Sequence, residues 1–176
     1  MTKYQDQLAE LERLRGRLIE RVSGVDSALL NRCPSGGGWS VAQIVAHVIS
    51  AEGRSLAYLE RKTQEAPERI PRAGVLGRFR SAALGWVLRS SIRVPAPPGA
   101  GEVPNAAELD ELRADWEQVR AAWSGFLETF PTELENRAVY KHPVAGRMSL
   151  EQALRFLILH LERHSGQVER TLAAAP

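Results

Sequence analysis

The sequence predicts an all-α fold, a four-helix bundle, and two observations lead to this prediction. Four long stretches repeat apolar residues at intervals of three and four, which is the spacing of amphipathic helices. The segments between them are rich in glycine and proline and carry no convincing strand pattern. Because 176 residues suffice for one sizeable core, we expect a single domain over residues 1–176.

The first predicted helix spans residues 4–22, and the second runs from Ser40 to about residue 62. Ser40 and Gln43 form an S-x-x-Q capping box, in which each side chain satisfies a backbone amide of the other residue. The second helix then presents an apolar stripe, made of Val41, Ile44, Val45, Val48, Ile49 and Leu56.

The third predicted helix covers residues 106–130 and the last covers residues 149–173. The inner face of the third is apolar, with Leu109, Leu112, Trp116, Val119, Trp123, Phe126 and Leu127. Ser149 and Gln152 repeat the capping box at the start of the last helix.

An irregular insertion rich in arginine and proline separates the second and third helices, at residues 69–101. It holds no acidic residue and six arginines, at positions 69, 72, 78, 80, 89 and 93. Its middle is compatible with a short basic helix, either as a lid that binds carboxylates or as a solvated face. Phe79 and Trp86 among arginines also allow a nucleic-acid platform, but a net charge of only +2 disfavours that partner.

Composition places the chain among ordinary globular proteins, with 44% hydrophobic and 25% charged residues. The sequence has no apolar run of membrane-spanning length and does not start like a signal peptide, so we expect a cytoplasmic protein with no membrane partner. The single cysteine, Cys33, agrees with a reducing compartment, and its place in a Gly-rich turn favours a structural or incidental role.

Two of the four histidines, His160 and His164, lie on the core-facing side of the last predicted helix. With His160 set to zero on a helical wheel, His164 falls at about 40°, within an apolar arc from about −40° to +160°. Burying two imidazoles without partners costs roughly 1–3 kcal/mol each. Residues at i and i+4 are close enough for both rings to bind one metal ion.

His47, at the margin of the apolar stripe of the second helix, is the third candidate ligand. Three histidines would leave one coordination position open, as in catalytic sites. The alternative is that these are core or boundary histidines with hydrogen bonds to neighbouring helices. Leu161 after His160 excludes the H-E-x-x-H motif, and no glutamate stands three residues before a histidine of the set, which excludes a di-iron site.

The sequence allows two interpretations for each of three further residues. His142, before Pro143, is either a general acid or base at the pocket mouth, able to close the site, or a loop residue. Gln167, one turn after His164, either orients a ligand histidine or water or bonds to another helix. We expect Trp39 to be a core anchor next to the helix cap and not a substrate platform.

The stretches "GGGWSVAQIVAHV", "YKHPVAGRMSLEQALRFLILH" and "HLERHSGQV" resemble the DinB/YfiT-like superfamily of metalloenzymes. The resemblance covers nearly the whole chain in helix order. It implies a four-helix bundle in which His47, His160 and His164 hold a divalent metal, zinc or nickel. Some members are thiol-dependent transferases or isomerases, and the resemblance transfers fold and site better than substrate.

These residues lead to three hypotheses of function. In the first, the metal activates a low-molecular-weight thiol as co-substrate, for transferase or isomerase chemistry on a small molecule. In the second, metal-bound water hydrolyses the substrate. In the third, a stress-linked bundle binds metal or small molecules without catalysis. The pattern is compatible with a homodimer and encodes no specific interface.

Overall fold

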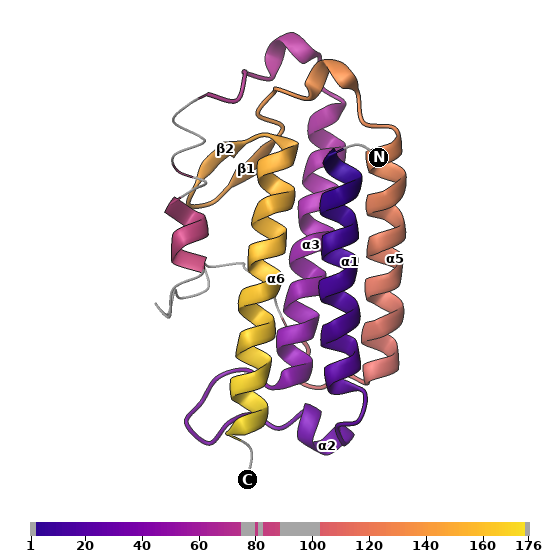
Figure 1. The fold of residues 1–176 in the computed structure, drawn as a ribbon, viewed down its shortest axis with the longest axis vertical. Coiled ribbons are helices and arrows are strands. Elements are labelled where there is room, and N and C mark those ends of the chain that lie inside the picture. The colour runs from indigo at the N-terminus through magenta and orange to yellow at the C-terminus, as the bar shows by residue number, and fades with distance from the viewer. Residues whose placement is uncertain (1–2, 75–79, 81–82, 89–102, 175–176) are drawn as a thin grey trace.

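The computed structural model describes residues 3–74, 80, 83–88 and 103–174 (Figure 1). Its four long helices are α1 (Lys3–Val22), α3 (Val41–Thr63), α5 (Leu109–Glu128) and α6 (Leu150–Ala173). They stand side by side, α1 packing against α5 and α6, and α3 packing against the same two helices (Figure 1). The predicted four-helix bundle is confirmed, and α5 is a few residues shorter than its periodicity suggested.

Both predicted capping boxes are present, and they fix the starts of the two helices that carry the histidines. Ser40 Oγ accepts the Gln43 amide at 3.2 Å, and Gln43 Oε1 accepts the Ser40 amide at 3.1 Å. Ser149 and Gln152 make the same pair of bonds at 3.3 and 2.9 Å. The rotational phase of α3 and of α6 is therefore set within their first turn.

The core lies where the apolar stripes of the helices meet, and Trp116 and Trp123 of α5 are fully buried in it. Glu52 of α3 is buried beside them, and it accepts hydrogen bonds from Trp116 Nε1 at 2.9 Å and from Arg120 at 2.8 Å. Glu52 follows His47 by five residues, about 140° around the helix. One side of α3 thus packs against α5 through Glu52, and His47 lies on a different side of the same helix.

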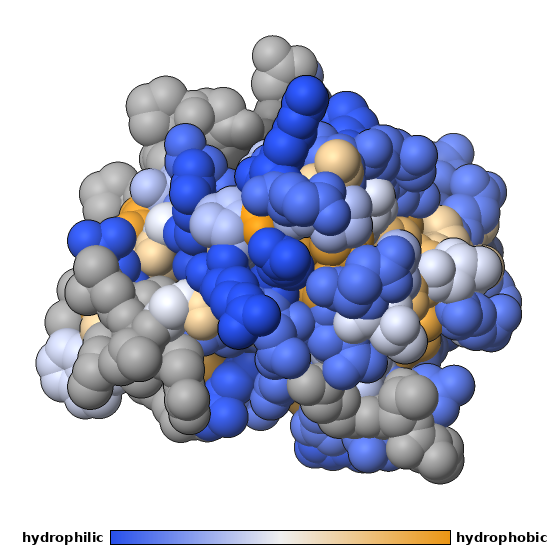
Figure 2. Space-filling model, turned by 90° about the horizontal axis from the view of Figure 1, so that it is seen from above, coloured by the Kyte–Doolittle hydropathy of each residue, from blue (hydrophilic) through white to orange (hydrophobic). Residues whose placement is uncertain are grey.

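Polar side chains cover most of the surface at the end of the bundle seen from above (Figure 2). Apolar residues show there only in gaps between them. No helix among the described residues combines the length and the hydropathy that a membrane crossing needs.

The sequence showed no convincing strand pattern, but the structure contains one short β-hairpin among the described residues. β1 (Tyr140–His142) pairs antiparallel with β2 (Gly146–Met148), in the register Tyr140↔Met148. Three residues per strand are too few for an alternating pattern to stand out. Gly146 has φ +75°, a left-handed conformation that other residues rarely adopt. The hairpin contacts α3 through β1 and α6 through β2, so it packs on both helices that carry the candidate histidines.

Three short helical elements lie in the connections outside the insertion, and they are α2 (Ser27–Leu30), η1 (Pro67–Arg69) and η2 (Thr132–Leu134). None was predicted, because a single turn shows no periodicity.

Part of the arginine-rich insertion packs against the outer side of α6. Residues 83–88 are helical, and Leu159 of α6 is buried against them although it lies outside the apolar arc of the wheel. A Cβ added at Gly85 would stand 3.2 Å from Leu159 Cδ1, and Arg163 donates to the carbonyls of Val87 and Leu88 at 3.3 and 3.2 Å. Phe79 and the arginines at 78, 89 and 93 lie outside the described residues.

Candidate metal centre

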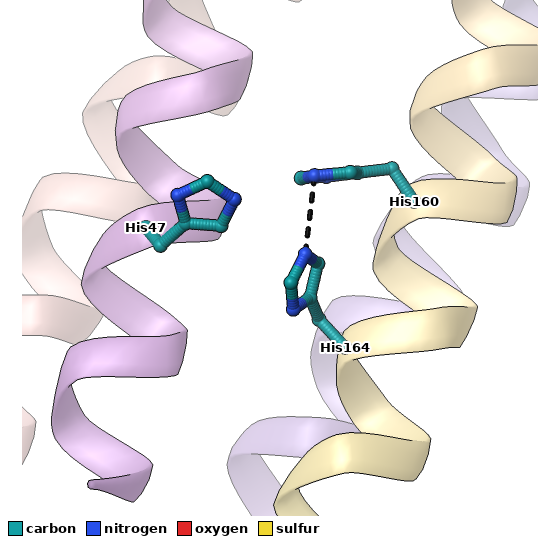
Figure 3. Close-up of side chains that lie close together, drawn as sticks. All are labelled: His47, His160 and His164. Carbon is teal, nitrogen blue, oxygen red and sulfur yellow. Dashed lines mark hydrogen bonds between the residues drawn. The ribbon is translucent and has the colours of Figure 1, made fainter. Parts of the chain in front are cut away.

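His47 of α3 faces His160 and His164 of α6 across the space between the two helices (Figure 3). One ring nitrogen from each of the three lies within 4.8 Å of the others. The Nε2 atoms of His160 and His164 are 3.2 Å apart, and the His47 ring centroid is 5.3 and 4.9 Å from theirs. The structure therefore brings together the three histidines that the sequence singled out.

The spacing of the two α6 histidines fits a single divalent ion. Two imidazole nitrogens at 2.0–2.1 Å from a tetrahedral ion are about 3.3 Å apart, close to the observed Nε2–Nε2 distance. The Nε2 atom of His160 contacts only His164 Nε2, and its buried Nδ1 has no hydrogen-bond partner among the described residues, so this ring is not fully satisfied as a core histidine. The cluster contains no fourth histidine, cysteine or carboxylate within the described part of the chain.

Burial keeps the two α6 histidines neutral. The pKa of His164 is lowered to about 4, mainly by burial and also by the neighbouring His47, while the bond to Gln167 opposes this shift. Burial lowers the pKa of His160 well below its usual range, and the adjacent His164 and His47 act in the same direction. Neutral rings at pH 7 offer the lone pairs that metal coordination requires.

Within the described part of the chain, Gln167 hydrogen-bonds to His164 and not to another helix. Its Oε1 lies 2.9 Å from His164 Nδ1 and accepts the proton of that nitrogen. This bond holds the ring in the tautomer whose Nε2 lone pair is directed toward the cluster.

A pocket of about 1390 Å³ opens beside the histidines. Its walls come from α3, α6, the hairpin, the loop 34–39 and, in the insertion, residue 80 and residues 83–88. Trp39 is half-buried, and its ring centroid is 4.8 Å from that of His47. It packs on the core as expected, but it also lines the pocket, which the sequence reading did not anticipate. Cys33 is exposed and does not line the pocket.

His142 lines the pocket from the hairpin, outside the three-histidine cluster. Its Nδ1 accepts the amides of Val144 and Ala145, both at 3.1 Å, and its ring packs on Phe156 with centroids 4.5 Å apart. Burial lowers its pKa to about 4. The ring is then neutral with its proton on Nε2, so it can donate a hydrogen bond and is poorly suited to be a fourth ligand.

Sequence reasoning missed several pocket residues. Arg54 and Tyr58 follow His47 by seven and eleven residues, which places them on the same face of α3, and this spacing could have revealed them. Ser55 and Tyr140 are buried in the pocket wall with their hydroxyls 2.9 Å apart. No sequence signal pointed to this pair, because it joins α3 to a strand that was not predicted.

A solved structure with the same fold is YfiT from Bacillus subtilis, which is described as a probable metal-dependent hydrolase with an unusual four-helix bundle topology. The two chains are 19% identical, and the match has a TM-score of 0.67 over 97% of this chain and 87% of YfiT. No curated protein sequence matches this chain. The DinB superfamily model matches residues 10–168, which include all of α3 and α5, most of α1 and α6, and all three histidines of the cluster. The chain therefore belongs to the DinB superfamily, as its resemblance implied.

Proposed function

We propose that this protein is a metal-dependent enzyme in which His47, His160 and His164 hold one divalent cation, zinc or nickel. The observation that carries the proposal is the convergence of one ring nitrogen from each of three histidines beside a large open pocket. Such an ion, when bound, lowers the pKa of the water or thiol next to it. Because three imidazoles bring no negative charge, the ion would keep its full positive charge toward the pocket.

The residues of the chain prepare this site in three ways. Gln167 fixes the orientation of His164, Trp39 and Phe156 shield the histidines from bulk water, and His142 offers its Nε2–H. A neutral N–H donor in the pocket wall would stabilise negative charge that develops on a substrate oxygen. In this role His142 is a hydrogen-bond donor and not a general base.

We infer that a low-molecular-weight thiol is the nucleophile in an S-transferase or isomerase reaction. No cysteine of the described residues lines the pocket, so a thiol would come from a small molecule. The pocket volume of about 1390 Å³ also exceeds the roughly 300–1000 Å³ of common one-ligand sites, which leaves room for a thiol and an electrophile together.

Hydrolysis by metal-activated water is the second candidate. It is favoured by the shared fold with YfiT, a protein described as a probable metal-dependent hydrolase. Hydrolysis needs only one organic substrate, so the two candidates differ in whether turnover depends on an added thiol.

The first experiment measures metal content by elemental mass spectrometry on untagged wild-type protein and on His160→Ala and His164→Ala. We expect about one equivalent of zinc or nickel in the wild type and its loss in both variants. Ser165→Ala, directly after His164 on α6, is the matched control and should retain the metal. A wild-type protein that binds no metal after reconstitution would overturn the proposal.

The second experiment assays the metal-loaded protein with an electrophilic aryl halide and with an aryl ester, each with and without glutathione, cysteine or another small thiol. Turnover that requires a thiol would support the transferase hypothesis, and ester cleavage without thiol would support the hydrolase hypothesis. A metal-loaded protein inactive across thiols and substrates would favour the non-catalytic binding bundle instead.

A further inference from the structure

The pocket is lined by five basic side chains and, among the described residues, by no acidic one. We call this set the pocket cations, and it consists of Arg54, Arg80, Lys141, Arg163 and Arg170. The whole chain is nearly balanced, with 23 basic and 21 acidic residues. The positive charge is therefore a property of this pocket and does not follow from the composition.

The pocket cations come from four separate parts of the chain. Arg54 lies on α3, Lys141 on β1, Arg163 and Arg170 on α6, and Arg80 in the insertion. The Arg80 side chain lies against the hairpin, with Nη1 3.6 Å from the position of a Cβ added at Gly146. Because the five charges line one pocket whose walls are partly apolar, their fields add and draw anions toward it.

Apolar side chains form much of the wall between these charges. They include Trp39, Leu84, Val87 and Phe156, from three different elements of the pocket. An apolar wall favours a ligand with a hydrophobic body, whereas the charged rim favours an anionic group on that body. Guanidinium groups bind carboxylates and phosphates through paired hydrogen bonds, which makes arginine suited to this task.

We propose that the substrate of this site is an amphipathic organic anion, with an aromatic or aliphatic body and a carboxylate, phosphate or sulfonate group. The inference that this ligand is a substrate rests on the proposed function. The hydrophobic body of the ligand would lie against the apolar wall, beside the three histidines. A neutral molecule of the same shape would gain the apolar contacts alone. A cationic one would be repelled by the rim and by a metal ion at the histidines.

The test uses two fluorescent probes that share one apolar skeleton. The anion is 8-anilinonaphthalene-1-sulfonate, and the neutral partner is N-phenyl-1-naphthylamine. Both are titrated into folded wild-type protein at low and high salt, and into Arg54→Gln and Arg170→Gln. Arg61→Gln on α3 and Arg155→Gln on α6 are the matched controls, because both are exposed on the same helices and neither lines the pocket.

We expect the wild type to bind the anionic probe more tightly than the neutral one, and this preference to weaken at high salt. Each pocket substitution should reduce the preference by roughly two- to fivefold, the range for a partly solvated charge pair, and the control substitutions should not change it. Equal affinity for the two probes, or a preference that the controls reduce as much as the pocket variants, would overturn the inference.

Metal binding is measured on the same samples, so that the two proposals can fail separately. Arg54→Gln and Arg170→Gln should bind one equivalent of metal like the wild type. Metal binding without anion preference overturns the substrate class and leaves the proposed function standing. Anion preference in a protein that binds no metal overturns the proposed function and supports only the anion selectivity of the pocket.

Discussion

Gln167→Leu should weaken metal binding about tenfold, because Gln167 alone among the described residues holds the Nδ1 side of His164. The perturbation removes one hydrogen bond of 2.9 Å and keeps the approximate size of the side chain. Loss of such an outer partner costs about 10- to 100-fold in metal affinity. We expect the lower end of this range, a loss of about 1.4 kcal/mol in the free energy of metal binding. The reason is that the Gln167 side chain is only half-buried and that the surroundings of the other two ligands do not change.

The assay is a competition titration of zinc between the protein and a chromophoric chelator at pH 7.5. Gln167→Glu should bind zinc at least as tightly as the wild type, since a carboxylate accepts the Nδ1 proton more strongly. Ser165→Ala removes a hydrogen bond to the Leu161 carbonyl on the same helix and should leave zinc affinity unchanged. A Gln167→Leu protein within twofold of the wild type would refute the role of this bond.

Three further predictions concern stability. Burial lowers the pKa of His142 to about 4. Between pH 6.5 and 4 this histidine is therefore protonated in the unfolded chain but largely neutral in the folded chain. The free energy of unfolding of the metal-free protein should accordingly decrease as the pH falls. Urea unfolding should show His142→Asn losing about 2 kcal/mol less over this window, and equal losses would contradict the assignment. Arg120→Leu leaves the buried Glu52 without its ion-pair partner and should lower the free energy of unfolding in urea by about 3–5 kcal/mol. The double variant Glu52→Leu/Arg120→Leu should recover most of this loss. A loss below about 1 kcal/mol in Arg120→Leu would be inconsistent with the buried pair. Ser149→Ala should cost about 1 kcal/mol and lower the melting temperature by about 2–4 °C, whereas an unchanged melting temperature would show that the cap contributes nothing.

The long helices and the three candidate ligands could be predicted because their signals are local. The apolar spacing of α6 places His160 and His164 on its inner side, and the capping box at Ser149 sets where that spacing begins. His47 was identified in the same way on α3. Such patterns depend only on the 3.6-residue period and on contacts within one turn.

The pocket could not be predicted to the same extent. Its hairpin wall has strands of three residues, too short for a visible alternation, and its Ser55–Tyr140 contact joins residues 85 positions apart. The burial of Leu159 likewise depends on residues 83–88, which fold back from the insertion onto α6. Trp39 was assigned to the core from its place beside the cap, and only its distance to His47 shows that it also faces the pocket.

By itself, the sequence determined that this chain forms four amphipathic helices and that three histidines lie on faces able to meet. The tertiary structure decided that the three rings converge, that Gln167 bonds to one of them, and that five basic side chains from distant segments surround one pocket. The physical reason is that helical periodicity fixes the direction of a side chain around its own axis. Which faces then meet depends on the packing of elements that are far apart in the chain.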